Sequence, residues 1–298
     1  AVLRGYSWYD IAGWEYNGYL WGTELSEIGR IRTLLRDFLL NRFRLFSYDP
    51  ARIDQFLKKL SRSVYLEGYS SILYQLARYQ NENNIKYRYN LKMIKATAEQ
   101  LPDYQQHEIT RAFGRKAISE YGSAEAGIIA FECPCGTKHI NMEHVIVEEE
   151  DQEILVTNLL SYAFPIIRYR LGDMIILAES HACPCGMKHS ALQEIIGRKG
   201  DIIIGKNNTY PSLLLYHIFK NLARKELLLD YQVIQKVPAE IEVFIFSGID
   251  NRQEALLLKE LVKNFGNDID CRIRRGKTPV LINGKRVDFI SEIEQRST

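Results

Sequence analysis

The stretch Tyr121-Gly122-Ser123-Ala124-Glu125 decides how this chain is interpreted, because apolar runs flank it on both sides. Residues 109–118 show a helix pattern that passes into a strand pattern, and residues 127–131 are again typical of a strand. The stretch is therefore predicted to be a tight loop at a strand end. Such a loop offers an aromatic face, a backbone without side-chain bulk at Gly122 and a carboxylate, which together suit a nucleotide and a divalent metal ion. Taken alone, the five residues also fit an ordinary polar turn.

Strand, glycine turn and helix alternate on the N-terminal side of this loop. Residues 91–97 are predicted to form a buried strand that ends at Ala98-Glu99, and residues 100–113 the following helix. The pattern is that of an α/β domain with a largely parallel sheet. Ligands of such sheets bind beyond the carboxyl ends of the strands, so Glu99 and the Tyr121 loop are expected at that edge.

Two further helices are predicted before the first of these strands. Apolar residues recur at helical spacing from Leu25 to Phe46, which predicts a long amphipathic helix whose apolar stripe packs in the core. Asp49-Pro50 is a typical start for the next helix.

The spacing of apolar residues changes on the C-terminal side of the Tyr121 loop. Residues 140–195 show short strands, at 145–147, 154–156, 165–170 and 174–177, which predict a β-rich subdomain. Residues 210–222 and 252–265 are predicted helices, and 231–235 and 241–246 predicted strands. We therefore expect a large domain at 1–196, a hinge at 197–201 and a small α+β domain at 202–298.

Composition limits the classes of function. The 298 residues are 46% apolar and 26% charged, with a formal net charge of +2. Such a chain can bury a sizeable core, and its charge gives no reason to expect nucleic acid or acidic membranes as partners. The sequence has no apolar run long enough to span a bilayer and no secretory leader, so the cytoplasm is the expected location.

Four of the five cysteines form two near-identical turns. Cys133-Pro134-Cys135-Gly136 is followed by His139, and Cys183-Pro184-Cys185-Gly186 by His189. Together they offer more ligands than one tetrahedral Zn²⁺ needs, so the exact set is open. We expect a structural zinc site that clamps the two loops, because four thiolates leave no open position for catalysis. Free or redox-active thiols are the alternative. The predicted metal ligands are Cys133, Cys135, His139, Cys183 and Cys185.

Several motifs together resemble those of the adenylate-forming superfamily, in the branch of phenylacetate-CoA ligase and the CapK-like proteins. Gly68-Tyr69-Ser70-Ser71 resembles its Gly-Tyr-Pro-Ser helix start, and residues 121–125 its Tyr-Gly-x-x-Glu loop. Residues 165–173 resemble its Pro-Leu-Ile-Arg-Tyr-Arg-x-Gly-Asp strand, and Gly197-Arg198 its hinge. The motifs occur in the family's order over most of the chain.

The resemblance implies an ATP-dependent reaction in which a carboxylic acid becomes an acyl-AMP and is passed to a thiol or an amine. It implies that Tyr121 stacks on adenine, Glu125 binds Mg²⁺, Asp173 accepts hydrogen bonds from the ribose hydroxyls and Arg198 reaches ribose or phosphate. Lys285 is the expected lysine of adenylation, with Lys277 as its rival. The nucleotide-binding set is expected to include Tyr121, Gly122, Ser123, Arg170, Asp173 and Arg198, and the catalytic set Glu125 and Lys285.

The acid's acceptor is left open between CoA, a carrier-protein thiol and an amine, and a homodimer is one open oligomeric form. The chain departs from the family pattern in three ways, and two of them, the missing phosphate loop and Ala124, favour an alternative, a zinc-stabilised binding protein without catalysis. The family's phosphate loop is absent from these residues, so a fragment or an inactive chain is expected. Ala124 replaces the usual Thr, and Gly200 the usual hinge Asp. A zinc-ribbon nucleic-acid binder is disfavoured by the near-neutral charge.

Overall fold

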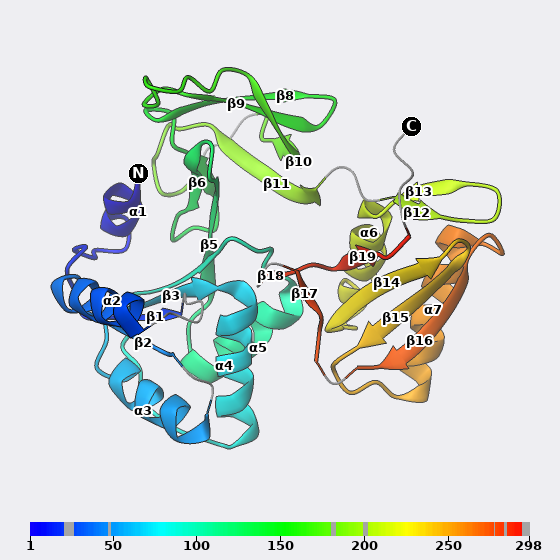
Figure 1. The fold of residues 1–298 in the computed structure, drawn as a ribbon, viewed down its shortest axis with the longest axis horizontal. Coiled ribbons are helices and arrows are strands. Elements are labelled where there is room, and N and C mark those ends of the chain that lie inside the picture. The colour runs from blue at the N-terminus through cyan, green and yellow to red at the C-terminus, as the bar shows by residue number, and fades with distance from the viewer. Residues whose placement is uncertain are drawn as a thin grey trace. The chain divides into compact units, whose positions relative to one another are not determined.

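The structure is a computed structural model that describes residues 1–20, 27–46, 49–179, 183–198, 202–276, 278–282 and 285–293. The chain forms two compact units, one of residues 1–171 and 175–195 and the other of residues 172–174 and 196–298 (Figure 1). Each unit has its own hydrophobic core. Among the described residues, no helix combines the length and the apolar composition that a membrane crossing requires.

The first unit is built on an eleven-stranded sheet in the order β2-β1-β3-β4-β5-β6-β7-β11-β10-β9-β8. Strands β2, β1, β3, β4 and β5 are parallel, whereas β6 and β7 continue the sheet antiparallel. This arrangement confirms the predicted α/β class, with a parallel sheet followed by a β-rich part. The strands are β1 Asn17–Leu20, β2 Arg42–Arg44, β3 Tyr65–Tyr69, β4 Met93–Thr97, β5 Ala117–Ser123, β6 Gly127–Glu132, β7 Lys138–Ile140, β8 Val145–Glu150, β9 Glu153–Asn158, β10 Tyr169–Leu177 and β11 Ala191–Arg198.

Helices cover both faces of the parallel part of the sheet. On one face, α3, α4 and α5 bury Leu57, Leu73 and Ile109 against apolar strand residues such as Leu66 and Ile94. The neighbouring strand residues point to the other face, as the two-residue period of a strand requires. There α1 packs its Tyr6 in a cluster with Tyr65, Met93 and Phe131. The helices are α1 Val2–Ser7, α2 Glu27–Leu39, α3 Pro50–Leu60, α4 Ser70–Glu82 and α5 Asp103–Phe113.

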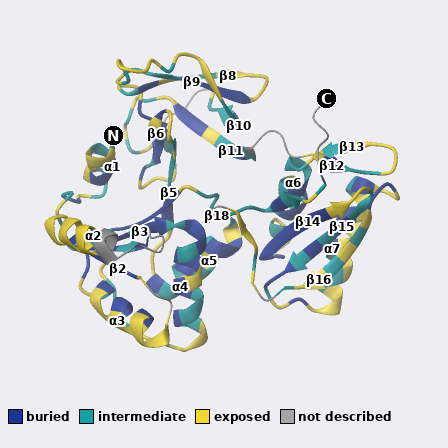
Figure 2. Cartoon of the chain, viewed as in Figure 1, coloured by how far each residue is buried: buried dark blue, intermediate teal, exposed yellow. Residues whose placement is uncertain are grey.

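Helix α2 corrects the prediction that the apolar stripe between Leu25 and Phe46 packs in the core. The helix ends at Leu39, and the apolar side chains described from residue 31 onward are exposed, including Phe38 at 80% and Ile31 at 68% (Figure 2). The side of α2 that is buried carries Asp37, whose carboxylate binds Arg42 and Arg44 of β2. Periodicity therefore identified the helix but not the face that contacts the sheet, where Asp37 binds two arginines of β2.

Two boundaries also differ from the sequence prediction. Residues 165–168 are not in a strand, since Arg168 has a φ of 47° and β10 begins at Tyr169. A positive φ at a non-glycine residue interrupts regular strand geometry. Strand β5 extends further than predicted, so Tyr121, Gly122 and Ser123 lie within it and the turn to β6 is short.

The second unit is α+β, as expected. Its four-stranded sheet has the order β16-β15-β14-β19, and helices α6 and α7 contribute Leu215, Ile218, Leu257 and Leu261 to the core. Helix α7 begins with a capping box, in which Asp250 and Gln253 each bind the other's backbone N–H. The elements are β12 Ile202–Ile204, β13 Thr209–Pro211, α6 Leu213–Ala223, β14 Tyr231–Val237, β15 Glu240–Ile245, α7 Asn251–Phe265, β16 Asp270–Arg275, β17 Leu281–Ile282, β18 Lys285–Arg286 and β19 Phe289–Ser291.

The predicted hinge at 197–201 falls mostly outside the described residues. Strand β11 continues through Arg198, and residues 199–201, which include Gly200, are not described. The hinge and the domain bounds 1–196 and 202–298 stay predictions.

Candidate functional site

The predicted nucleotide loop is the end of β5 and the turn that joins it to β6. Tyr121 is half-buried and packs against the core cluster of Ile129 and Ile154. The register between β5 and β6 shifts between Tyr121 and Gly122. A Cβ atom on Gly122 would lie 2.3 Å from the carbonyl oxygen of Gly127, so only glycine fits there. The strand end therefore fixes an aromatic ring beside a bare stretch of backbone.

Hydrogen bonds also fix the turn that carries Glu125. The Ser123 hydroxyl accepts a bond of 3.1 Å from the N–H of Ala126, and the Asn158 side-chain amide donates one of 3.1 Å to the carbonyl of Glu125. The Glu125 side chain is exposed, and its carboxylate has no hydrogen bond or ion pair with any other described residue. The turn thus presents an unpaired carboxylate, which suits the predicted role in binding Mg²⁺.

The other predicted nucleotide residues lie in different environments. Asp173 is half-buried in β10, after Gly172, whose φ is 75°. Arg170 is on the same strand, and its guanidinium binds Glu150 and also Glu153, the latter at 3.0 Å. Arg170 therefore already has two carboxylate partners, and a phosphate would have to compete with them.

Three predicted basic side chains lie outside the described part of the chain. These are the side chains of Arg198 and Lys285 and the whole of Lys277. The neighbour of Lys285 is well defined, because Arg286 forms an ion pair with the buried Asp230 and donates a 2.8 Å bond to the carbonyl of Tyr231. Residues 172–174 group with the second unit, so the convergence of Glu125, Asp173 and Arg198 on one nucleotide stays a prediction.

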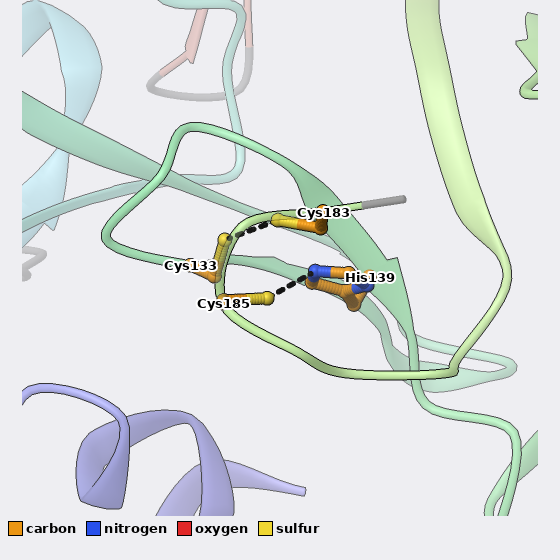
Figure 3. Close-up of side chains that lie close together, drawn as sticks. All are labelled: Cys133, His139, Cys183 and Cys185. Carbon is orange, nitrogen blue, oxygen red and sulfur yellow. Dashed lines mark hydrogen bonds between the residues drawn. The ribbon is translucent and has the colours of Figure 1, made fainter. Parts of the chain in front are cut away.

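The cysteine turns come together in the first unit (Figure 3). Among the described residues, the ligand atoms of Cys133, His139, Cys183 and Cys185 all lie within 4.8 Å of one another. The Cys133 and Cys183 sulfurs are 3.7 Å apart, and Cys185 Sγ is 3.2 Å from His139 Nε2. Cys135, also predicted as a ligand, is exposed and is not in this group.

Local backbone geometry explains why the two turns are alike. In each, the glycine N–H donates to the carbonyl of the first cysteine, at 2.8 Å for Gly136 and 2.9 Å for Gly186. Both glycines have a left-handed φ, 84° and 78°. His139 Nδ1 lies 3.3 Å from the carbonyl oxygen of His189. A proton on Nδ1 donated to that carbonyl leaves the Nε2 lone pair directed at the thiols, the usual orientation of a histidine that binds a metal.

A buried charged network, which the sequence analysis missed, lies on the α1 face of the parallel strands. In the sheet register, Tyr19 of β1 is beside Glu67 of β3, which is beside Lys95 of β4. The Lys95 ammonium is 2.9 Å from Glu67 and 3.0 Å from Glu120 of β5. Only 7% of the Lys95 side chain is exposed, so its charge depends on these two carboxylates.

Neighbouring hydroxyls complete the network. Tyr6 of α1 donates a 2.6 Å hydrogen bond to Glu67, and Thr97 donates a 3.0 Å bond to Glu120. Burial raises the pKa of Tyr6, and the charge of Glu67 raises it further, so its hydroxyl stays a donor. Burial alone would lower the pKa of Lys95, but Glu67 and Glu120 outweigh it and the pKa is raised, so the ammonium stays charged.

A sequence signal for the network does exist. The polar residues occupy alternate positions in Tyr65–Tyr69 and Met93–Thr97, the period that places side chains on one face of a strand. The signal was missed because residues 91–97 were interpreted as a uniformly buried strand, and because each residue stands alone in the sequence.

The chain is similar to known proteins in sequence and in fold. No family model matches it. Protein CapK of Staphylococcus aureus is 27% identical over 173 residues, which are 55% of this chain and 38% of that protein. Indoleacetate–lysine synthetase of Pseudomonas savastanoi is 34% identical over 113 residues, 36% of this chain and 28% of that protein.

Among solved structures, that of 2-hydroxyisobutyryl-CoA ligase in the postadenylation state, in complex with an HIB-AMP ligand, matches with a TM-score of 0.70 at 14% identity. The match covers 97% of this chain and 67% of that chain. The fold is therefore shared over nearly the whole chain, whereas the matched segments span less than half of either curated relative.

Proposed function

We propose that the protein activates a carboxylic acid with ATP. The premise is that the relatives and the fold of this chain point to the adenylate-forming superfamily. The superfamily resemblance inferred from the motifs is confirmed. In the proposed reaction, a carboxylate oxygen attacks the α-phosphorus of ATP and pyrophosphate leaves, which gives an acyl-AMP. The acceptor then attacks the carbonyl carbon, and AMP leaves.

The observation that carries the proposal is the fixed turn after β5, with its aromatic ring, its bare backbone and its unpaired carboxylate. Tyr121 is proposed to stack on adenine beside Gly122 and Ser123. Glu125 is proposed to hold Mg²⁺, which neutralises phosphate charge. Asp173 has two acceptor oxygens for the ribose hydroxyls.

Basic residues complete the proposed site. Arg170 and Arg198 are assigned to nucleotide binding, and Lys285 to the α-phosphate, with Lys277 as the alternative. The ion pair of Arg286 with Asp230 supports this choice of lysine, because it anchors the short strand on which Lys285 lies.

The acceptor class follows from the relatives only as a proposal. One curated relative is by name an indoleacetate–lysine synthetase, and the structural neighbour is a CoA ligase. An amine and the thiol of CoA are therefore the two acceptors favoured here, and a carrier-protein thiol is the third. The proposal also places the chain in the phenylacetate-CoA ligase branch and includes a homodimer and a cytoplasmic location.

The thiol cluster is proposed to hold a structural Zn²⁺ ion. Three cysteines and one histidine match a common tetrahedral donor set, and the hydrogen bond of His139 to the His189 carbonyl matches the orientation such a ligand needs. A bound ion would join the β6–β7 turn to the loop before β11, which are fifty residues apart in the chain.

Pyrophosphate exchange into ATP tests the proposed function. We would measure exchange by the whole protein with Mg²⁺ over a panel of aryl, fatty and amino acids. The expected result is exchange that depends on one class of acid and falls at least about a hundredfold in Glu125→Gln, because a metal-binding charge is lost. The matched control is Glu82→Gln, which removes an exposed carboxylate from α4 and is expected to keep the activity.

The same measurement separates the two functions considered. Exchange that is unaffected by Glu125→Gln would remove the proposed role of this turn. No exchange with any acid, together with no binding of ATP or AMP, would favour a zinc-stabilised binding protein without catalysis.

A further inference from the structure

The strongest unassigned feature of the molecule is a cavity of about 200 Å³ beside the charged network. Its walls include Tyr6, Tyr19, Arg42, Glu67, Lys95 and Thr97. All lie in the first unit, at the side of the parallel strands that α1 covers. The volume exceeds what a few water molecules need and suits a small organic molecule.

One side of the cavity carries an excess negative charge. Two carboxylates, Glu67 and Glu120, share the single ammonium of Lys95. Glu67 Oε2 accepts the bonds from Tyr6 and Lys95, whereas Glu67 Oε1 accepts none from the described residues. Glu67 therefore offers the cavity a carboxylate oxygen that lacks a donor.

The opposite charge lies on another wall. Arg42 and Arg44 both bind the buried carboxylate of Asp37. Arg42 uses its Nε for Asp37, and its guanidinium lies 4.0 Å from the centre of the Tyr19 ring. Its two terminal nitrogens donate no hydrogen bond within the described part of the chain. They are the natural partners of a carboxylate.

We propose that this cavity binds a small zwitterion of the α-amino acid class, with its ammonium group at Glu67 and its carboxylate at Arg42. An unpaired acceptor and an unpaired donor edge line one small cavity, and a ligand with both charges satisfies both. An acid without the amino group leaves Glu67 unsatisfied, and an amine without the carboxylate leaves Arg42 unsatisfied.

The binding site stands on its own geometry, and only the role of the ligand rests on the proposed function. In that role, an amino acid is either the acid that is activated or the amine that accepts the acyl group. Binding measured without ATP tests the site separately from the reaction.

Isothermal titration calorimetry of the whole protein, without nucleotide, tests the inference. The probes are L-leucine and L-phenylalanine, each beside the matched acid without the amino group, isocaproate or phenylpropanoate. The matched amines without the carboxylate, isoamylamine and phenylethylamine, complete the set. At least one amino acid is expected to bind at least about tenfold more tightly than both of its partial analogues, since each lost charged hydrogen bond costs about that factor or more.

Two variants and a matched control connect the binding to the cavity. Glu67→Gln and Arg42→Gln are each expected to weaken amino-acid binding by about tenfold or more. Glu82→Gln is the control, because it removes an exposed carboxylate of α4 that is not among the lining residues. It is expected to change the Kd less than about threefold, and circular dichroism of all three variants checks that they fold.

Each outcome decides the question. No amino acid binding at millimolar concentration, equal binding of the partial analogues, or equal effects of Glu67→Gln and Glu82→Gln would overturn the proposal. Exchange of pyrophosphate with simple acids, without amino-acid binding, would leave the proposed function intact and remove only this inference. Amino-acid binding that needs Glu67 and Arg42, without pyrophosphate exchange by any acid, would support this inference and remove the proposed function.

Discussion

The thiol cluster and the Lys95 network are both buried groups of polar side chains in the first unit, but they are assembled differently. The thiol cluster comes from two copies of one short motif, whose glycine turns shape each half locally. The network comes from single residues on α1, β3, β4 and β5, which only the sheet register brings together. A site built from a local motif can be recognised in the sequence, whereas a site built from several strands can be recognised only once the fold is known.

The two regions are also expected to differ in what holds them. A metal ion would bind the thiol cluster together, so its stability depends on an added component. The network is held by charges that the chain itself supplies, in a place where each charge needs its partner.

Cys183→Ser is expected to give the largest effect. Loss of one of four ligands would release the metal ion and lower the free energy of unfolding by more than about 4 kcal/mol. Urea unfolding and metal analysis of the purified protein check this, with about one zinc per chain expected in the wild type. Cys271→Ser is the control, because Cys271 is half-buried in the second unit and outside the cluster. A metal-free wild-type protein that is equally stable after chelation would contradict the assignment.

Lys95→Met is expected to give the second effect. It leaves Glu67 and Glu120 buried together without a cation, which costs about 3 kcal/mol of unfolding free energy. Lys92→Met, on the same segment, removes an exposed ion pair with Asp10 and is expected to cost much less stability than Lys95→Met, because solvent screens that pair. Urea unfolding measures both variants. Equal losses of stability would mean that the Lys95 ion pairs stabilise the fold no more than the exposed ion pair of Lys92 does.

The pH dependence of stability in the wild type and in Lys95→Met should show the smallest effect. The pKa of Lys95 is raised above 10.5 by its carboxylates, so its stabilising contribution is complete below pH 10.5 and is lost as the pH rises through the raised value. The stability difference between wild type and Lys95→Met should therefore stay constant from neutral pH to pH 10.5 and decrease at higher pH. A difference that already decreases well below that pH would show that the ammonium is not held by Glu67 and Glu120.

Much of the fold could be predicted from the sequence because its signals are local. The alternation of strand, turn and helix gave the α/β class, and the buried strand at residues 91–97 corresponds to β4. The apolar stripe of α2 misled, because periodicity cannot show what covers a helix face. The Pro165 segment also misled, since the positive φ of Arg168 depends on its tertiary surroundings.

The candidate sites also differ in whether a local sequence signal identifies them. Cys133, His139, Cys183 and Cys185 were predicted because their spacing repeats, and the coordinates place their ligand atoms in one group, while Cys135 as a ligand stays a prediction. Glu125 was predicted from its motif, and the structure adds the fixed turn on which it stands. Glu67, Arg42 and Lys95 have no motif, so only the strand register and the cavity reveal them.

A crystal structure of the protein grown with AMP and Mg²⁺ tests the central claim most directly. We expect adenine against the Tyr121 ring, the ribose hydroxyls at the Asp173 carboxylate and a basic side chain, Arg198 or Lys285, near the phosphate. Nucleotide bound elsewhere, or Glu125 and Asp173 on separate surfaces with AMP at neither, would contradict the account.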